Sequence, residues 1–285
     1  LEALWVHEHN DRVNQPLLRQ LLAAKEFRAR AAAVRVLQHW FDRVDGGMAL
    51  LATAVNDAEP RVRLEAVRAL SFVPTAEAAN TALQVLAHPM DYYLSYVLDS
   101  TMSTLERVWK PVLTTGGPFA SDNAAGLAFV LDRLPPADLI RVKRSTPVYQ
   151  ALLSRAGVTP AARREALEAL AAQNGTTLLH EIIAAIDRMD GTPGSAPASA
   201  DLMQVLGTLS PAQLAPERSA VERLARSGRN DSVREGAFLA LMQIDDDAAP
   251  AWQLASSSPR LRIDLLRGAT KLPSGSASQS RRRKT

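Results

Sequence analysis

The chain of 285 residues contains no cysteine, and aromatic residues make up only 5% of it. The absence of cysteine excludes disulfides, thiolate metal sites, cysteine nucleophiles and a Cys-x-x-Cys-His haem attachment within these residues. No apolar run approaches the roughly 20 residues that a membrane-spanning helix needs. HExxH, GxSxG and glycine-rich phosphate-loop motifs are also missing. We therefore expect a non-enzymatic segment with no cofactor, no metal, no small-molecule substrate and no membrane span.

The net charge excludes less than it first suggests. The chain is formally +3, but residues 281–284 (Arg-Arg-Arg-Lys) contribute +4, so residues 1–280 carry −1. Residues 273–285 are rich in serine, glycine and basic side chains and offer too little apolar area to bury, so we expect a disordered basic tail there. A nearly neutral folded part disfavours nucleic acid as the partner.

What the sequence does contain is one helical pattern that recurs. Glu59–Leu70, EPRVRLEAVRAL, has a proline in its first turn and apolar residues on one stripe. Related stretches occur as EFRARAAAVRVL, PAARREALEAL, DSVREGAFLAL and PRLRIDLLRGA. Such a repeat predicts an all-α fold, an α-α superhelix built from antiparallel helical hairpins. The alignment also predicts that Ala66, Ala166 and Ala237 lie buried where helices approach closely.

The expected domain organisation is one solenoid over residues 1–272. The repeat period lapses at residues 110–122, which include LTTGGPF, so we expect an irregular interruption there. Residues 190–200 include GTPGSAPAS, which makes them the best candidate linker by composition.

One stretch, HPMDYYLSYVLDSTMSTLE, contains three of the four tyrosines of the chain. Tyr92, Tyr93 and Tyr96 cover more than one face of a helix, so at least one ring is expected to be exposed beside Asp91. Tyrosine combines a large apolar area with a polar tip, which suits a protein interface. Packing of two rings between repeats, with the third bridging to a neighbouring loop, is the alternative interpretation.

Arginines recur on the second helices of the hairpins, and they could form a positive ridge that binds a partner or phosphates. The four candidates are Arg61, Arg68, Arg260 and Arg267. Interleaved carboxylates such as Glu65 favour a mixed, solvated face instead.

His7 and Asp11 are four residues apart and form the one conceivable metal pair, although an exposed helix end explains them better.

The repeats resemble the HEAT repeat, which places an Asp or Asn in the turn before a Val-Arg pair. Asp57 with Arg63, and Asp231 with Arg234, occupy the positions of the turn acid and the helix arginine. The resemblance implies a ladder of Asp and Arg side chains along the stack. The first repeat departs from the pattern, with Ala24 or Lys25 where the acid should be.

Residues 3–109 further resemble the repeat region of large bacterial PVC-type haem-binding dehydrogenases, through ALWVHEHNDRVNQPLLRQLLAAKEFRARAAAVRVLQHW and VNDAEPRVRLEAVRALSFVP. Those proteins join a sugar-dehydrogenase-like propeller, a HEAT region and a c-type cytochrome module. The resemblance implies a periplasmic or exported parent in which this segment, itself carrying no catalytic residue, is a spacer between redox modules. Its partners are then adjacent domains of the same polypeptide. A stand-alone HEAT adaptor that binds a protein on its concave face is the main alternative, followed by a nucleic-acid-binding HEAT protein.

Overall fold

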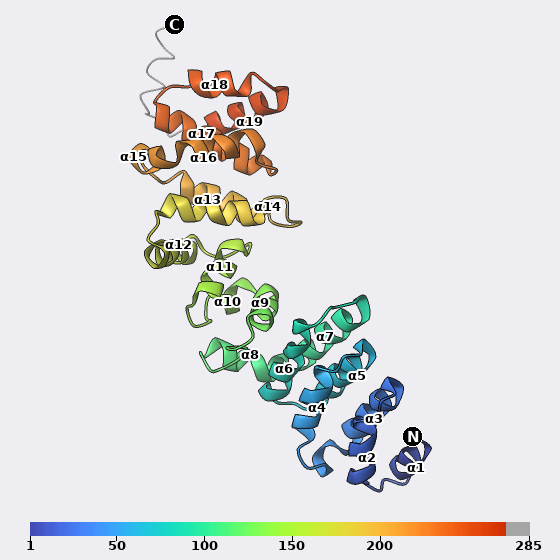
Figure 1. Cartoon of the computed structure of the whole chain (residues 1–285). Coiled ribbons are helices and arrows are strands. Elements are labelled where there is room, and N and C mark those ends of the chain that lie inside the picture. Colours follow the sequence, from blue (N-terminus) through green and yellow to red (C-terminus); the bar gives the residue numbers. More distant parts are fainter. Residues whose placement is uncertain (272–285) are drawn as a thin grey trace. The chain divides into compact units, whose positions relative to one another are not determined.

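A computed structural model describes residues 1–271, and these residues contain helices and no strand. Consecutive helices form antiparallel hairpins that pack on the next hairpin along the chain, which confirms the fold class that the repeats predict. The chain divides into two compact units, residues 1–133 with 141–143, and residues 134–140 with the chain from Arg144 onward. Figure 1 shows the order of the helices in each unit.

Unit 1 contains the first half of the repeats and an irregular segment before its last helix. Its helices are α1 (Glu2–His9), α2 (Gln15–Leu22), α3 (Phe27–Trp40), α4 (Gly47–Val55), α5 (Pro60–Leu70), α6 (Ala76–Ala82), α7 (Tyr92–Thr104), α8 (Glu106–Thr114) and α9 (Ala124–Arg133), with short 3-10 helices η1 (Phe41–Arg43) and η2 (Leu83–Ala87). The second helices of its first three hairpins are adjacent, since α3 packs on α5 and α5 packs on α7.

Unit 2 repeats the same architecture. Its helices are α10 (Pro136–Leu139), α11 (Thr146–Ser154), α12 (Pro160–Asn174), α13 (Leu178–Met189), α14 (Ala196–Leu206), α15 (Pro211–Leu214), α16 (Arg218–Ser227), α17 (Asp231–Asp245), α18 (Ala249–Ala255) and α19 (Pro259–Thr270), with the 3-10 helix η3 (Ala215–Glu217). The second helices α12, α14, α17 and α19 pack on one another in that order. We use "second helices" below for these four together with α3, α5 and α7.

Polar caps and first-turn prolines determine where many helices begin. The side chains of Asn14, Thr75 and Asp91 accept hydrogen bonds from backbone N–H groups of α2, α6 and α7. Pro60 and Pro160 occupy first-turn positions of α5 and α12, where their missing N–H has no helical partner.

The core lies between successive hairpins and includes fully buried small residues. Ala66, Ala166 and Ala237 are all fully buried, as the repeat alignment predicted. Larger apolar residues fill the space around them, among them Val67 and Leu70 on α5. Because protein interiors are packed as densely as organic crystals, these alanines leave no space for a larger side chain.

The expected interruption at residues 110–122 begins later than the repeat pattern suggested. Residues 110–114 belong to α8, which continues through Pro111, and the segment after it is packed rather than loose. The rings of Trp109 and Phe119 stack with centroids 5.7 Å apart. Asn80 Oδ1 accepts a hydrogen bond of 3.0 Å from the N–H of Ala120. Composition alone misses these contacts, because it does not show which side chains meet in the fold; Asn80 and Ala120 are 40 residues apart.

The prediction of a linker at residues 190–200 is wrong for the last five of those residues. Residues 196–200 are the first residues of α14, and Ala198 and Ser199 are fully buried. The carboxylate of Asp190 accepts hydrogen bonds from the N–H groups of Arg229 and Asn230 at 2.8 and 3.2 Å. Glycine and proline here shape a packed turn instead of a linker. The predicted tail, residues 273–285, lies outside the described residues.

Candidate functional site

An arginine stands four residues after the N-cap of most second helices. These arginines are Arg30, Arg63, Arg163, Arg234 and Arg262. Arg63 Nη1 donates to the carbonyls of Asp57 and Ala58 at 2.8 and 2.9 Å. Arg234 Nη1 donates in the same way to the carbonyls of Gly228 and Arg229, at 2.6 and 3.0 Å. Arg30 and Arg262 also donate to carbonyls of the turn before their own helices, whereas Arg163 donates to carbonyls at the end of α11 and to that of Arg155.

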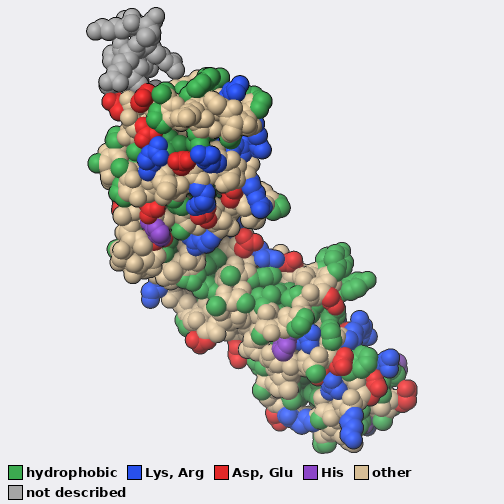
Figure 2. Space-filling view, turned by 45° about the horizontal axis from the view of Figure 1, so that its top comes forward, with side chains coloured by type: hydrophobic (Ala, Val, Ile, Leu, Met, Phe, Trp, Pro, Cys, Tyr) green, Lys and Arg blue, Asp and Glu red, His purple; other side chains and the backbone are tan. Residues whose placement is uncertain are grey.

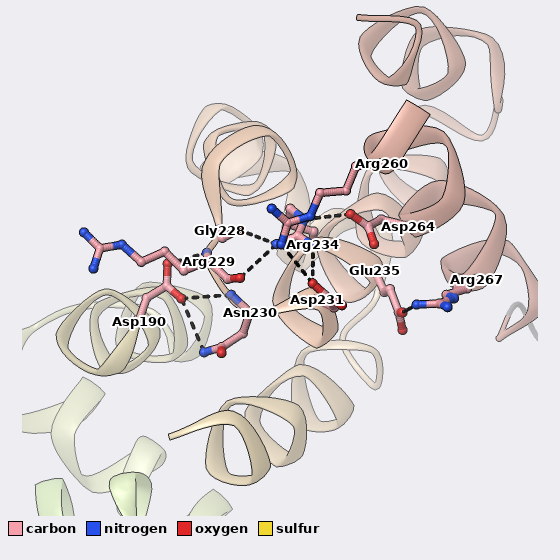
Figure 3. A network of polar contacts seen from close by, with 10 residues as sticks. All are labelled: Asp190, Gly228, Arg229, Asn230, Asp231, Arg234, Glu235, Arg260, Asp264 and Arg267. Carbon is pink, nitrogen blue, oxygen red and sulfur yellow. Dashed lines mark hydrogen bonds and ion pairs between the residues drawn. The ribbon is translucent and has the colours of Figure 1, made fainter. Parts of the chain in front are cut away.

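Three of these arginines also reach a carboxylate on the following hairpin. Arg163 Nη2 lies 2.7 Å from Asp201 Oδ2, and Arg234 Nε lies 2.6 Å from Asp264 Oδ2. Both aspartates stand six residues after the N-cap of the next second helix. Figure 3 shows the Arg234 pair together with the turn carbonyls that Arg234 binds. We call these ion pairs the arginine ladder.

In unit 1 the ladder uses the turn acid instead. Arg30 binds Asp57 with two parallel hydrogen bonds, each 2.7 Å long. Burial raises the pKa of Asp57, but the hydrogen bonds from Arg30 and from the N–H of Glu59 outweigh burial and hold that pKa below its ordinary value. The missing acid of the first repeat therefore does not remove the ladder there, because the arginine of that repeat reaches forward to the next turn.

The ladder stops at Arg63. Arg63 is only 3% exposed, and the Nε atom of Arg63 has no hydrogen-bond partner among residues 1–271. The position on α7 that would supply a carboxylate, six residues after the N-cap, is Val97. What joins α7 to α5 is a buried hydrogen bond of 3.1 Å from Thr101 Oγ1 to the carbonyl of Val67.

Three arginines converge on one buried carboxylate, Glu65. Arg61 and Arg68 lie 3.0 and 3.4 Å from it on α5, and Arg35 reaches it from α3. Burial raises the pKa of Glu65, yet the hydrogen bond from Arg35 and the three positive charges outweigh that effect and lower the pKa below 4.5. One carboxylate facing three arginines leaves this cluster with an excess of positive charge.

The tyrosines of α7 lie on the surface. Tyr92, Tyr93 and Tyr96 are 77%, 69% and 66% exposed, so the alternative in which two of them pack between repeats is wrong. The first two rings meet edge-on with centroids 5.5 Å apart. Asp91 has a structural part in this arrangement, because its Oδ1 accepts the N–H of Leu94 at 2.7 Å and caps the helix that carries the rings.

One arginine of α5 and one tyrosine of α7 occupy equivalent positions on helices that pack on each other. Arg61 and Tyr93 both stand two residues after the N-cap of their helices, and α5 packs on α7. Packed helix axes lie about 8–10 Å apart, so equivalent side chains on two neighbouring helices face the same solvent region. We give the name tyrosine–arginine surface to Arg61 and Arg68 of α5 together with Tyr92, Tyr93 and Tyr96 of α7.

The other two candidate arginines lie in unit 2, on α19. Arg260 is 3.0 Å from Asp231, and Arg267 is 3.5 Å from Glu235 (Figure 3). Figure 2 shows positive and negative side chains side by side on the visible surface of this unit. The arginines expected to form a positive ridge are therefore paired with carboxylates.

The histidine and carboxylate considered for a metal face different partners. His7 Nε2 lies 3.0 Å from Asn14 Nδ2, whereas Asp11 is bound to Arg43. Within residues 1–271, no group of three or more His, Cys, Asp and Glu side chains is arranged to hold a metal ion.

Comparison with known proteins supports the repeat assignment. Residues 14–98 match the family model described as HEAT repeats. Proteins of this repeat family are generally non-catalytic helical scaffolds for protein interaction. The matched residues extend from α2 to the first half of α7. No curated protein matches the chain. No helix among the described residues is both long and apolar enough to cross a membrane.

Sequence reasoning missed two features of the surface. Arg35 was not among the candidates, although its charge completes the cluster around Glu65. Ile263 and Leu266 on α19 are about half exposed, at 51% and 54%. Aligning every second helix on its N-cap, rather than on its apolar residues, would have placed Leu266 at a position that is buried in other repeats.

Proposed function

We propose that the chain is a non-catalytic scaffold that binds a protein partner on the tyrosine–arginine surface. The observation that carries this proposal is the exposure of three tyrosine rings on one helix, at 66–77% each. Tyr and Arg are enriched in the energetically dominant part of protein interfaces, because they bury large areas and still form hydrogen bonds.

The charges beside the rings favour a partner segment that combines apolar and acidic side chains. Glu65 is buried beneath Arg35, Arg61 and Arg68, and the side chains of those arginines are 39–53% exposed. They therefore keep donors available to a second carboxylate. Extended nucleic-acid backbone is a weaker fit, because the remaining candidate arginines, Arg260 and Arg267, already face Asp231 and Glu235.

The test replaces Tyr93 with a photo-crosslinking amino acid in the full chain and identifies the crosslinked protein in an extract of the source cells. Tyr149 is a matched control, because it is the fourth tyrosine of the chain and is less exposed, on α11. We expect a specific adduct from position 93 and none from position 149.

The affinity of the purified partner is then measured against the triple variant Tyr92→Ser/Tyr93→Ser/Tyr96→Ser. Loss of aromatic anchors from an interface core costs 2 kcal/mol or more, so we expect affinity to fall about 30-fold or more. The rings are exposed in the free chain, so the melting temperature should stay unchanged. A partner that binds the triple variant within threefold of the parent would overturn the proposal.

A finer role is proposed from the sequence resemblance of residues 3–109: a spacer between redox modules of a larger periplasmic or exported dehydrogenase. The partner on the tyrosine–arginine surface would then be an adjacent domain of the same polypeptide. The gene sequence around this segment tests the idea. Propeller repeats on one side and Cys-x-x-Cys-His on the other would support it, and the absence of both from the complete reading frame would refute it.

A further inference from the structure

The outward face of α19 has the pattern of an internal repeat. Eight residues after the N-cap, the second helices carry an apolar residue that the next helix covers. Those residues are Val34, Val67, Leu167, Met203 and Phe238, all of them buried. On α19 the same position is Leu266, which is 54% exposed, and Ile263 on the same helix is 51% exposed.

One second helix, α7, carries a polar residue at the position where the others carry an apolar one. On α7 the equivalent position is Asp99, which is exposed and pairs with Arg133. The last second helix of unit 1 thus carries a charged residue there, whereas the last second helix of unit 2, α19, carries leucine. Repeat stacks that end in solvent generally have a polar outer face, whereas the outer face of α19 exposes two apolar residues, Ile263 and Leu266.

The same face of α19 carries an arginine at the position that the arginine ladder uses on other second helices. Arg262 stands four residues after the N-cap of α19, and its Nη2 donates to the carbonyl of Ser256 at 2.9 Å, as the other ladder arginines do to their own turns. Arg163 and Arg234 at this position each bind an aspartate of the next second helix. Arg262 faces no carboxylate within residues 1–271, and residues 272–285 contain neither Asp nor Glu.

We propose that the outward face of α19 seats a further amphipathic helix, supplied from outside residues 1–285, that carries a carboxylate six residues after its N-cap. The carboxylate binds Arg262, and the apolar face of the helix covers Ile263 and Leu266. This partner is defined by the contact that α19 itself makes with α17, where Asp264 reaches Arg234 and Phe238 becomes buried.

The experiment supplies such a helix in tethered form. The full chain is extended after Thr285 by a second copy of residues 248–271, which contains the Asp264-bearing helix. Residues 272–285 serve as the tether and can span about 45 Å when extended. Because the chain has no cysteine, Leu266→Cys in the first copy provides a unique thiol whose labelling rate reports whether the face is covered.

We expect the extension to slow labelling of this thiol at least tenfold. Arg262→Gln in the first copy, or the Asp264→Asn change in the appended copy, should restore the rate to within about twofold of the unextended chain. A control thiol from Ser227→Cys, exposed on α16, should label equally fast with and without the extension.

Four results would overturn the proposal. The first is an unchanged rate at position 266. The second is protection that survives both charge substitutions, because apolar association without the ladder would then explain it. The third is equal protection of the control thiol, which marks non-specific association. Self-association of the unextended chain that disappears with Arg262→Gln would make a second copy the occupant and would also refute a foreign helix.

Discussion

Replacing Arg234 with methionine tests whether the arginine ladder stabilises the stack. The side chains of Arg234 and Asp264 are 2% and 3% exposed, and their atoms approach to 2.6 Å. Burial lowers the pKa of Arg234, but the hydrogen bonds to Asp264 and Asp231 raise it more, so the guanidinium is firmly charged. Methionine keeps much of the volume but leaves Asp264 buried without its partner.

The expected cost follows from the groups left behind. Removing one member of a buried ion pair costs about 3–5 kcal/mol, because the remaining charge has no compensation. The carbonyls of Gly228 and Arg229 also lose their donors, which is partly offset by water where they are accessible. We therefore expect Arg234→Met to destabilise unit 2 by about 3–5 kcal/mol. The double variant Arg234→Met/Asp264→Leu should recover about 2 kcal/mol of that loss, since no buried charge remains.

The assay is hydrogen exchange of the α17 and α19 amides at increasing urea concentration, because it reports unit 2 alone in a chain of two units. Arg226→Met is the control: its side chain is 56% exposed in a pair with Glu222, so it should cost no more than about 0.5–1 kcal/mol. The reasoning would be refuted if Arg234→Met and Arg226→Met had equal effects, or if the double variant were less stable than Arg234→Met alone.

Three further predictions follow from burial and charge. Ala66→Leu should destabilise unit 1 by roughly 1–3 kcal/mol through overpacking, and Ala172→Leu at an exposed position of α12 should not lower the melting temperature; equal melting temperatures would contradict the alignment. The folded-state pKa of Glu65 lies below its ordinary value of 4.5, so its ionised form adds stability above about pH 4.5 and that stability is lost as pH falls through the folded pKa. Urea titrations should therefore show the parent losing more stability than Glu65→Gln below pH 4.5, and parallel pH profiles would refute the assignment. Truncation after Ser280 removes a charge of +4 and should abolish any low-salt nucleic-acid binding in a salt-titrated anisotropy assay; retained binding near physiological salt would instead implicate the arginines of the helices.

The sequence predicted the repeat and its small core residues because both depend on local spacing. Ala66, Ala166 and Ala237 are buried as the alignment requires. It could not predict which arginine meets which carboxylate. Arg30 reaches the turn acid Asp57, whereas Arg234 reaches a helix acid in the next hairpin. That choice depends on the separation of two helices, which no spacing within one helix encodes.

Amino-acid composition predicted the irregular segments less well than the repeat spacing predicted the helices. The segment after α8 reads as a loop, yet the stack of Trp109 on Phe119 orders it. Residues 190–200 read as a linker, yet Asp190 binds two backbone N–H groups across the turn to α17. Glycine and proline indicate where a regular helix ends. They do not indicate whether the irregular backbone then finds partners.

Two neighbouring pairs of second helices lack the ion pair of the arginine ladder: α14 with α17, and α5 with α7. Between α14 and α17 the ladder arginine is replaced by Ser199, and the aspartate position is Gly236, where an added Cβ would lie 2.6 Å from Met203. Close apolar packing thus replaces the ion pair there.

At α7 neither arrangement is present. Within residues 1–271 Arg63 forms no ion pair with the next hairpin, although its charge helps to lower the pKa of Asp57, and Val97 occupies the aspartate position. Moving the members of a buried ion pair apart would leave both charges uncompensated, so we expect such a pair to resist relative movement of its two helices. The helix that displays the exposed tyrosines is therefore held to α5 by apolar packing and the Thr101 hydrogen bond alone. We therefore expect small shifts of α7 against α5 to cost less free energy than shifts of α19 against α17, which would let α7 adjust its rings to a partner.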